Sequence, residues 1–309
     1  MIVALAGGVG GAKLAQGLYQ IEPPNSLTVV VNTADDFDLW GLRIMPDTDT
    51  VLYTLASIAN PETGWGIAGD SYATLDMLAH YGEDPWFRIG DRDFATHIQR
   101  TRLLREGGSY TQVARALAGA LGIHASVLPM SDQPVATVVS TPQGDLAFQE
   151  YFVRRRHSDE VRAVRFEGIE GARASRPALE AIGSARAIVF CPSNPIVSIG
   201  PILGVPGMRD ALLAASAPKI AVSPIVGGRA LKGPADRMLA DLGEEVSAFG
   251  VASRYVGLLT GMVIDALDAA DAPRIEALGM RVLVTDTIRR DASERARLAR
   301  EVVRFAEAL

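Results

Sequence analysis

The sequence predicts an α/β protein with an open, mostly parallel sheet flanked by helices. Short apolar runs indicate the strands, and several of them lack the polar alternation of half-exposed strands, as in parallel sheets covered on both faces. These runs lie at residues 2–6, 27–31, 135–139, 187–190, 219–223 and 281–284. Helix-like segments lie between or after them, at 12–20, 48–58, 111–121, 176–183, 207–215, 234–242, 253–267 and 291–308.

Each early run ends in turn-forming residues, which supports its reading as a strand. The run 2–6 meets glycine, 27–31 meets asparagine, 187–190 meets Cys191-Pro192, and 219–223 meets proline. The interval between the strands predicted near residues 31 and 135 is too long for one crossover helix. We therefore expect a single domain over residues 1–309, in which approximately residues 60–125 form a mainly helical insertion that caps the sheet.

Composition excludes several classes of protein. The formal net charge of the 309 residues is −6, which argues against a nucleic-acid surface. The single cysteine, Cys191, rules out an intrachain disulfide and a site with several thiolates. No apolar run reaches the ~18 residues of a membrane span, and the first is too short for a signal segment. We expect a cytoplasmic protein without membrane or nucleic-acid partners.

The turn after the first predicted strand is rich in glycine and precedes a helix. Gly7, Gly8, Gly10 and Gly11 would let a ligand approach the backbone, and the first helical N–H groups would face an anion, most often phosphate. Lys13 would add a positive charge. The spacing matches neither the dinucleotide fingerprint, whose third glycine is replaced by Lys13, nor a P-loop. A turn that only packs strand on helix is the alternative.

An acidic segment follows the second predicted strand and includes Asp35, Asp36, Asp47 and Asp49. The carboxyl ends of parallel strands share one edge of the sheet, so these carboxylates would face the glycine turn. Carboxylates and phosphates need a cation between them, and Mg²⁺ suits both. We expect some of Asp36, Asp47 and Asp49 to bind Mg²⁺. Helix capping and solvated loop charge are the alternatives.

Polar residues in three further loops are candidates for ligand contacts. Arg88 could pair with a phosphate or a carboxylate. Ser193 and Asn194, after the strand at 187–190, could bind a base or a sugar. The segment 223–229 again follows a strand. Each loop could also be ordinary turn structure.

Six blocks of the chain together resemble the 2-phospho-L-lactate transferase (CofD) family of coenzyme F-420 biosynthesis. The resemblance extends over about residues 2–291. The final block commonly reads Thr-Asp-Thr-Ile-Met in this family, whereas this chain has Arg289 in place of the methionine. The blocks are LAGGVGGAKLAQGL, VVNTADDFDLWGLRIMPDTDTVLY, WFRIGDRDFATHIQRT, CPSNPIVSIGPIL, SPIVGGRALKGPADRM and VTDTIRRD.

The resemblance implies a Rossmann-like core, a homodimer and a Mg²⁺-dependent transfer. A phosphorylated three-carbon acid, such as 2-phospho-L-lactate or phosphoenolpyruvate, would pass from a guanosine diphosphate (GDP)-linked donor to the ribityl hydroxyl of the deazaflavin Fo, releasing GMP.

The resemblance also assigns roles to residues. It implies that Asp49 and Arg88 bind Fo, and that Asp36 and Asp49 are the catalytic and metal-binding residues, one of them orienting the hydroxyl. Gly7, Gly8, Gly10, Gly11, Lys13, Ser193 and Asn194 would bind the donor nucleotide.

Two other functions fit parts of the sequence. A non-enzymatic regulator that binds nucleotide sugars would share the glycine turn and an Asp-Asp loop, but the continuation Phe37-Asp38-Leu39-Trp40 favours the transferase. A dinucleotide oxidoreductase would need an acidic residue at the end of the second strand, and Asn32 stands there.

Overall fold

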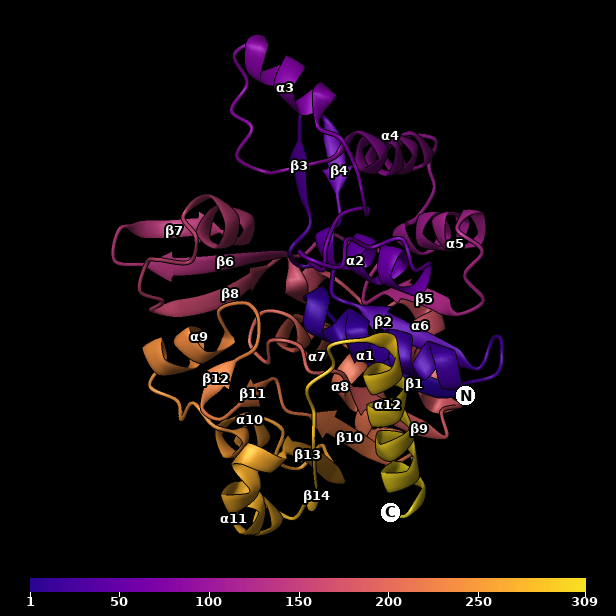
Figure 1. The fold of residues 1–309 in the computed structure, drawn as a ribbon, viewed down its shortest axis with the longest axis vertical. Coiled ribbons are helices and arrows are strands. Elements are labelled where there is room, and N and C mark those ends of the chain that lie inside the picture. Colours follow the sequence, from indigo (N-terminus) through magenta and orange to yellow (C-terminus); the bar gives the residue numbers. More distant parts are fainter.

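A computed structural model describes all residues, 1–309, and its core is one sheet of seven parallel strands (Figure 1). The strand order is β14-β13-β10-β9-β1-β2-β5. This confirms the predicted fold class. The strands are β1 (Ile2–Ala6), β2 (Leu27–Val31), β5 (Ser126–Pro129), β9 (Ala187–Phe190), β10 (Lys219–Val222), β13 (Gly261–Asp265) and β14 (Arg281–Thr285).

Helices cover both faces of this sheet, because alternate residues of each buried strand point to opposite sides. In β1, Ile2, Ala4 and Ala6 join one apolar cluster, whereas Val3 and Leu5 join the other. The first cluster packs against α1 (Gly8–Ile21), α2 (Pro46–Leu55), α5 (Tyr110–Ala120) and α12 (Ala292–Glu307). The second packs against α6 (Arg176–Gly183), α7 (Ile199–Gly204), α8 (Met208–Ala214), α9 (Ala235–Asp241), α10 (Ala248–Ser253) and α11 (Ala272–Glu276).

Two smaller substructures extend from the sheet. The hairpin of β3 (Phe37–Leu39) and β4 (Leu42–Ile44) projects with α3 (Ala73–His80) and α4 (Asp91–Arg105) at the top of Figure 1. An antiparallel sheet of β6 (Ala136–Thr141), β7 (Gly144–Ala147) and β8 (Ala163–Glu167) lies at the left. The remaining elements are η1 (Glu150–Arg154), η2 (Ile169–Gly171), β11 (Ile225–Val226), β12 (Arg229–Ala230) and η3 (Ala266–Asp271).

The structure corrects two predicted elements. The strand predicted at 135–139 belongs to the small antiparallel sheet, and β5 is the strand that pairs with β2. The predicted helix 253–267 is wrong: α10 ends at Ser253, and β13 occupies Gly261–Asp265. Every residue of β13 is buried, and a fully buried strand shows no period that would separate it from a buried helix.

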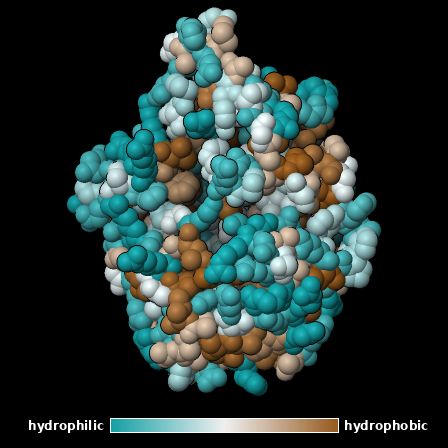
Figure 2. Space-filling model, in the orientation of Figure 1, coloured by the Kyte–Doolittle hydropathy of each residue, from teal (hydrophilic) through white to brown (hydrophobic).

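The order of the strands reverses at β1. The chain proceeds from β1 to β2 and β5 on one side, then returns to β9 on the other side and continues to β10, β13 and β14. In open α/β sheets ligands bind beyond the carboxyl ends of the strands at such a reversal. Figure 2 shows a hollow near the middle of a mostly hydrophilic face. None of the helices combines the length and apolar character needed to cross a bilayer.

Candidate active site

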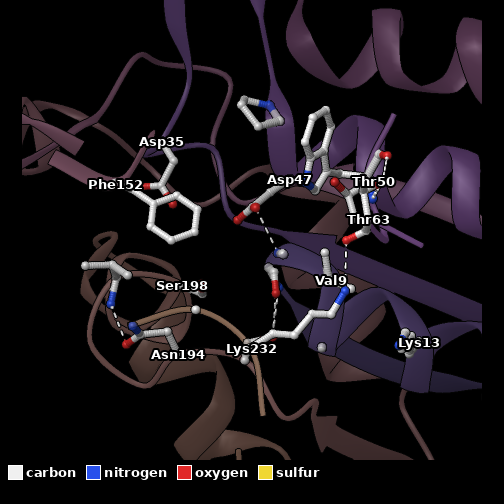
Figure 3. A pocket seen from close by; sticks show the side chains of 18 of the residues that line it. Val9, Lys13, Asp35, Asp47, Thr50, Thr63, Phe152, Asn194, Ser198 and Lys232 are labelled. Carbon is white, nitrogen blue, oxygen red and sulfur yellow. Dashed lines mark hydrogen bonds between the residues drawn. The ribbon is translucent and has the colours of Figure 1, made fainter. Parts of the chain in front are cut away.

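A cavity of about 740 Å³ lies at the carboxyl ends of the strands, where the strand order reverses (Figure 3). The loops that follow β1, β2, β9, β10 and β14 all contribute to its wall. Residues of α2 and α4 complete the wall from the side of the projecting helices. Segments from both ends of the chain therefore meet around one cavity.

The glycine turn lies in this wall, and its close packing leaves no space for larger residues. Helix α1 begins at Gly8, whose φ is +61°, a conformation that favours glycine. A Cβ at Gly7 would lie 2.6 Å from Asp47 Oδ2, and one at Gly10 would overlap the carbonyl oxygen of Pro192. The turn is thus packed tightly against the loops after β2 and β9, and the start of α1 faces the cavity.

Ser193 and Asn194 hold the loop after β9 in place. The Ser193 hydroxyl accepts from the Gly7 N–H at 3.1 Å and donates to the Gly7 carbonyl at 2.8 Å. Asn194 Oδ1 accepts from the N–H groups of Ile196 and Val197, at 2.9 and 3.3 Å. Both residues line the cavity, but these bonds already use several of their hydrogen-bond donors and acceptors.

Asn32 joins two aspartates beside the glycine turn. Its Nδ2 donates to Asp35 Oδ2 at 2.9 Å and to Asp47 Oδ2 at 3.0 Å. The other oxygen of Asp47 accepts from the Gly8 N–H at 2.8 Å. Burial raises the pKa of Asp47 to about 6, although its hydrogen bonds from Asn32 and Gly8 oppose this rise. Burial and the nearby charge of Asp47 raise the pKa of Asp35 as well.

The structure does not bring Asp36 into the cavity wall. Its carboxylate is buried 3.9 Å from Arg43, and neither oxygen has a hydrogen-bond partner. Burial raises the pKa of Asp36 well above its usual value, with Arg43 and Arg100 opposing this rise. Its neighbour Asp35 lines the cavity instead.

Asp49 lines the cavity within a buried polar network. Arg100 binds both carboxylate oxygens of Asp49, and its Nη1 lies 3.0 Å from Asp49 Oδ2 and from His97 Nδ1. His97 Nε2 lies 3.4 Å from Asp93 Oδ1, which also accepts the Tyr53 hydroxyl at 2.6 Å. The network fixes the Asp49 carboxylate in the cavity wall.

Besides Arg289, three cations of the cavity wall have no carboxylate partner within 4.0 Å. Lys13 is one, and its pKa is lowered by burial and by the charges of neighbouring cations. Lys232 donates to the carbonyl of Thr63 at 2.9 Å, passing Val9 of the glycine turn (Figure 3). Arg88 stacks on Tyr72, 4.3 Å from the ring centre. In Figure 3, Asp35 lies on the left and Lys13 on the right, with Asp47 and Lys232 between them.

The structure therefore gathers most residues that the sequence assigned to a site. Gly11 and Asp36 are the two that do not line the cavity. Sequence reasoning gave no role to Asp35, Tyr53, Asp93, His97, Arg100 or Lys232. The spacing of Asp93, His97 and Arg100 at i, i+4 and i+7 would have placed them on one face of a helix.

Fold and site define a Rossmann-like α/β protein with a charged ligand cavity at the reversal of strand order. The chain belongs to the family described as 2-phospho-L-lactate transferase CofD, whose model matches residues 2–301. A phosphoenolpyruvate transferase of Streptomyces griseus is 45% identical over 312 residues, which cover 99% of this chain and 98% of that protein. A 2-phospho-L-lactate transferase of Methanosarcina mazei is 40% identical over 302 residues, with 98% and 99% covered.

A solved structure shares the fold at low sequence identity. It is a crystal structure of a UPF0052-family protein from Bacillus halodurans, with a TM-score of 0.63 and 98% of both chains covered. Its sequence identity to this chain is 16%, so the likeness concerns the fold alone.

Proposed function

We propose that this protein transfers a phosphorylated three-carbon acid, of 2-phospho-L-lactate or phosphoenolpyruvate type, to the ribityl hydroxyl of the deazaflavin Fo in coenzyme F-420 biosynthesis. The donor is the GDP-linked acid, and GMP is released. One observation carries the proposal: the Gly8 N–H at the helix start donates to Asp47 Oδ1 of the acidic segment at 2.8 Å. Both residues line one cavity, which Asp49 and Arg88 also line. The family and the names of the relatives support it.

Mg²⁺ is part of the proposal, and the buried oxygens of the acidic segment suit it. Asp35 Oδ1 is buried without a hydrogen-bond partner, and Asp47 lies beside it on the cavity wall. Carboxylate oxygens are the ligands that Mg²⁺ prefers. We propose that Asp35 and Asp47 hold the ion together with Asp49, whereas the other predicted ligand, Asp36, faces Arg43 outside the cavity wall. When bound, it would neutralise diphosphate charge.

The residues of the chain would position the two substrates. N–H groups at the start of α1 would bind the donor diphosphate, and Lys13 and Lys232 would balance its charge. Arg88 would bind Fo. Asp49, held by Arg100, would orient the attacking hydroxyl and accept a hydrogen bond from it.

The bond changes follow from this arrangement. The ribityl oxygen bonds to the acid-side phosphorus, and the bond from that phosphorus to the bridging oxygen breaks. The hydroxyl proton leaves to the weak base or to water, and the bridging oxygen departs on GMP. Phosphoryl transfer of this kind depends on positioning and charge neutralisation more than on a protein nucleophile.

The test is to incubate the purified, folded protein with Fo, Mg²⁺ and each GDP-linked donor. We expect GMP release and a new phosphodiester of Fo, detected by mass spectrometry. Absence of both products with every donor would refute the transferase. Binding of uridine-linked sugars without binding of Fo would identify the regulator instead.

The homodimer and the cytoplasmic location also remain proposals. Light scattering of the purified protein tests the first, and fractionation of the cells that produce it tests the second.

A further inference from the structure

Arg289 lies on a loop that is fixed at both ends. The loop 286–291 runs from β14 to the start of α12, beside α1 (Figure 1). The N–H and the hydroxyl of Thr287 both donate to Asp265 Oδ2, at 2.8 and 2.9 Å. Beyond the loop, α12 packs so closely on α1 that a Cβ at Gly17 would overlap the carbonyl oxygen of Arg295. The position of Arg289 in the cavity wall is therefore set by the fold.

The guanidinium of Arg289 is buried and has no partner. The residue is 9% exposed, and its Nε and Nη1 are buried without a hydrogen bond. The neighbouring Arg290 pairs with Glu294 at 3.0 Å, whereas Arg289 has no carboxylate within 4.0 Å. A buried, unpaired charge is destabilising, so such a residue in a ligand cavity indicates an anionic ligand. Burial lowers the pKa of Arg289 to about 10, which leaves it charged at neutral pH.

Arg289 lies on the side of the cavity that holds the glycine turn. Its loop leads into α12, which packs on α1, the helix that begins at the glycine turn. Its charge also helps to lower the pKa of Lys13 in the first turns of α1. On that side the proposed donor carries its nucleotide, whose anionic group is the phosphate.

We infer that Arg289 is a phosphate-binding residue that holds the phosphate remaining with the nucleotide, from donor binding until GMP leaves. The inference rests on the proposed function for the identity of the nucleotide. A guanidinium donates charge-assisted hydrogen bonds to phosphate oxygens, and no group of the protein accepts a hydrogen bond from the buried Nε and Nη1 of Arg289. As the bond to the bridging oxygen breaks, this phosphate gains negative charge, and Arg289 stabilises it.

The experiment compares Arg289→Met with the wild type in the binding of GMP, inorganic phosphate and Fo, by calorimetry at low and high salt. We expect GMP affinity to fall about 10- to 100-fold, the size of a charge-assisted hydrogen bond, and its salt dependence to weaken. Fo affinity stays unchanged. Arg281→Met, at the exposed opposite end of β14, removes the same charge and serves as the control.

Thermal unfolding separates a binding role from a structural one. Removal of an unpaired buried charge should raise the melting temperature of the ligand-free protein and reduce the further rise that GMP causes. If Arg289→Met does not fold, Arg289→Gln is tested with the same expectations for binding.

Wild-type GMP affinity in these variants would overturn the inference, as would a loss of Fo affinity with GMP affinity retained. One further result would contradict the proposed function but not the inference about Arg289. GMP binding that depends on Arg289, in a protein that releases no GMP from any donor, would refute the transferase and leave the phosphate site in place.

Discussion

Asp47 Oδ1 accepts a hydrogen bond from the Gly8 N–H at 2.8 Å, so a carboxylate already occupies the first amide of helix α1. In the ligand-free protein this carboxylate stands where a phosphate oxygen would bind to the helix start. If the donor binds as we propose, its binding is an exchange: the amide passes from Asp47 to the phosphate, and Asp47 becomes free for a cation.

Asp47→Asn should preserve the fold and remove the metal dependence. Asparagine keeps the shape of the side chain but has one acceptor oxygen where Asp47 has two, so it keeps only one of the bonds from Gly8 and Asn32. It also lacks the charge that a cation needs. We expect turnover to fall about 100-fold or more, the order for loss of a preorganised charge. The measurement is a Mg²⁺ titration of the transfer rate. Asp210→Asn, exposed on α8, is the control, and wild-type Mg²⁺ dependence in Asp47→Asn would exclude Asp47 as a ligand.

The stability of the ligand-free protein should fall as the pH rises from about 4 to about 6. The pKa of Asp47 is about 6 in the folded state, against about 3.9 in unfolded chains, so the folded state binds the proton more tightly in this window. Stability then decreases with pH, by at most about 3 kcal/mol from this residue. The difference in free energy of unfolding between wild type and Asp47→Asn isolates this effect. A difference that does not change with pH would contradict it.

Substitutions of Asp49 and Arg100 should have strongly non-additive effects on stability. Asp49→Asn should lower turnover at least about 100-fold, because the charge beside the acceptor is lost. Arg100→Met should destabilise the fold by about 3–5 kcal/mol, since it leaves a buried carboxylate unpaired. The double variant should recover part of that stability but none of the activity. Additive losses of stability in denaturant unfolding would show that the pair does not act as a unit.

Gly10→Ala should disrupt the glycine turn, because the new Cβ would overlap the carbonyl oxygen of Pro192. We expect a loss of at least about 1–3 kcal/mol in the free energy of unfolding, as for overpacking elsewhere, together with weaker GMP binding. Gly119→Ala is the matched control: it also lies in a helix, and its Cβ would have no atom within 4 Å. That variant should be slightly stabilised, by about 0.5 kcal/mol. Equal stability of the two variants would refute the close approach of Gly10 to the Pro192 carbonyl.

Strands were predictable from sequence where an apolar run ended in turn residues. Both conditions hold for β1, β2, β9 and β10, and their bounds were predicted to within one residue. β13 was not predicted because its first four residues are apolar and follow Leu258 and Leu259, which left helix and strand equally possible. The strand at 136–141 was found, but its partners depend on contacts distant in sequence.

Within the site, sequence order identified the loops better than the side chains. The structure brings the glycine turn and the acidic segment together, as expected from strands that share an edge. It does not follow from sequence which of two adjacent aspartates faces the cavity, because loop backbone has no fixed period. Asp35 lines the cavity and Asp36 faces Arg43. Arg289 stood out in sequence only as a departure from a family block.

The bond between Lys232 and the Thr63 carbonyl has a kinetic consequence. It joins segments 169 positions apart in the sequence across Val9, at the edge of the glycine turn. We expect this link to slow the escape of a bound nucleotide past that edge, so that product release involves the parting of two chain segments as well as the change of bonds at phosphorus.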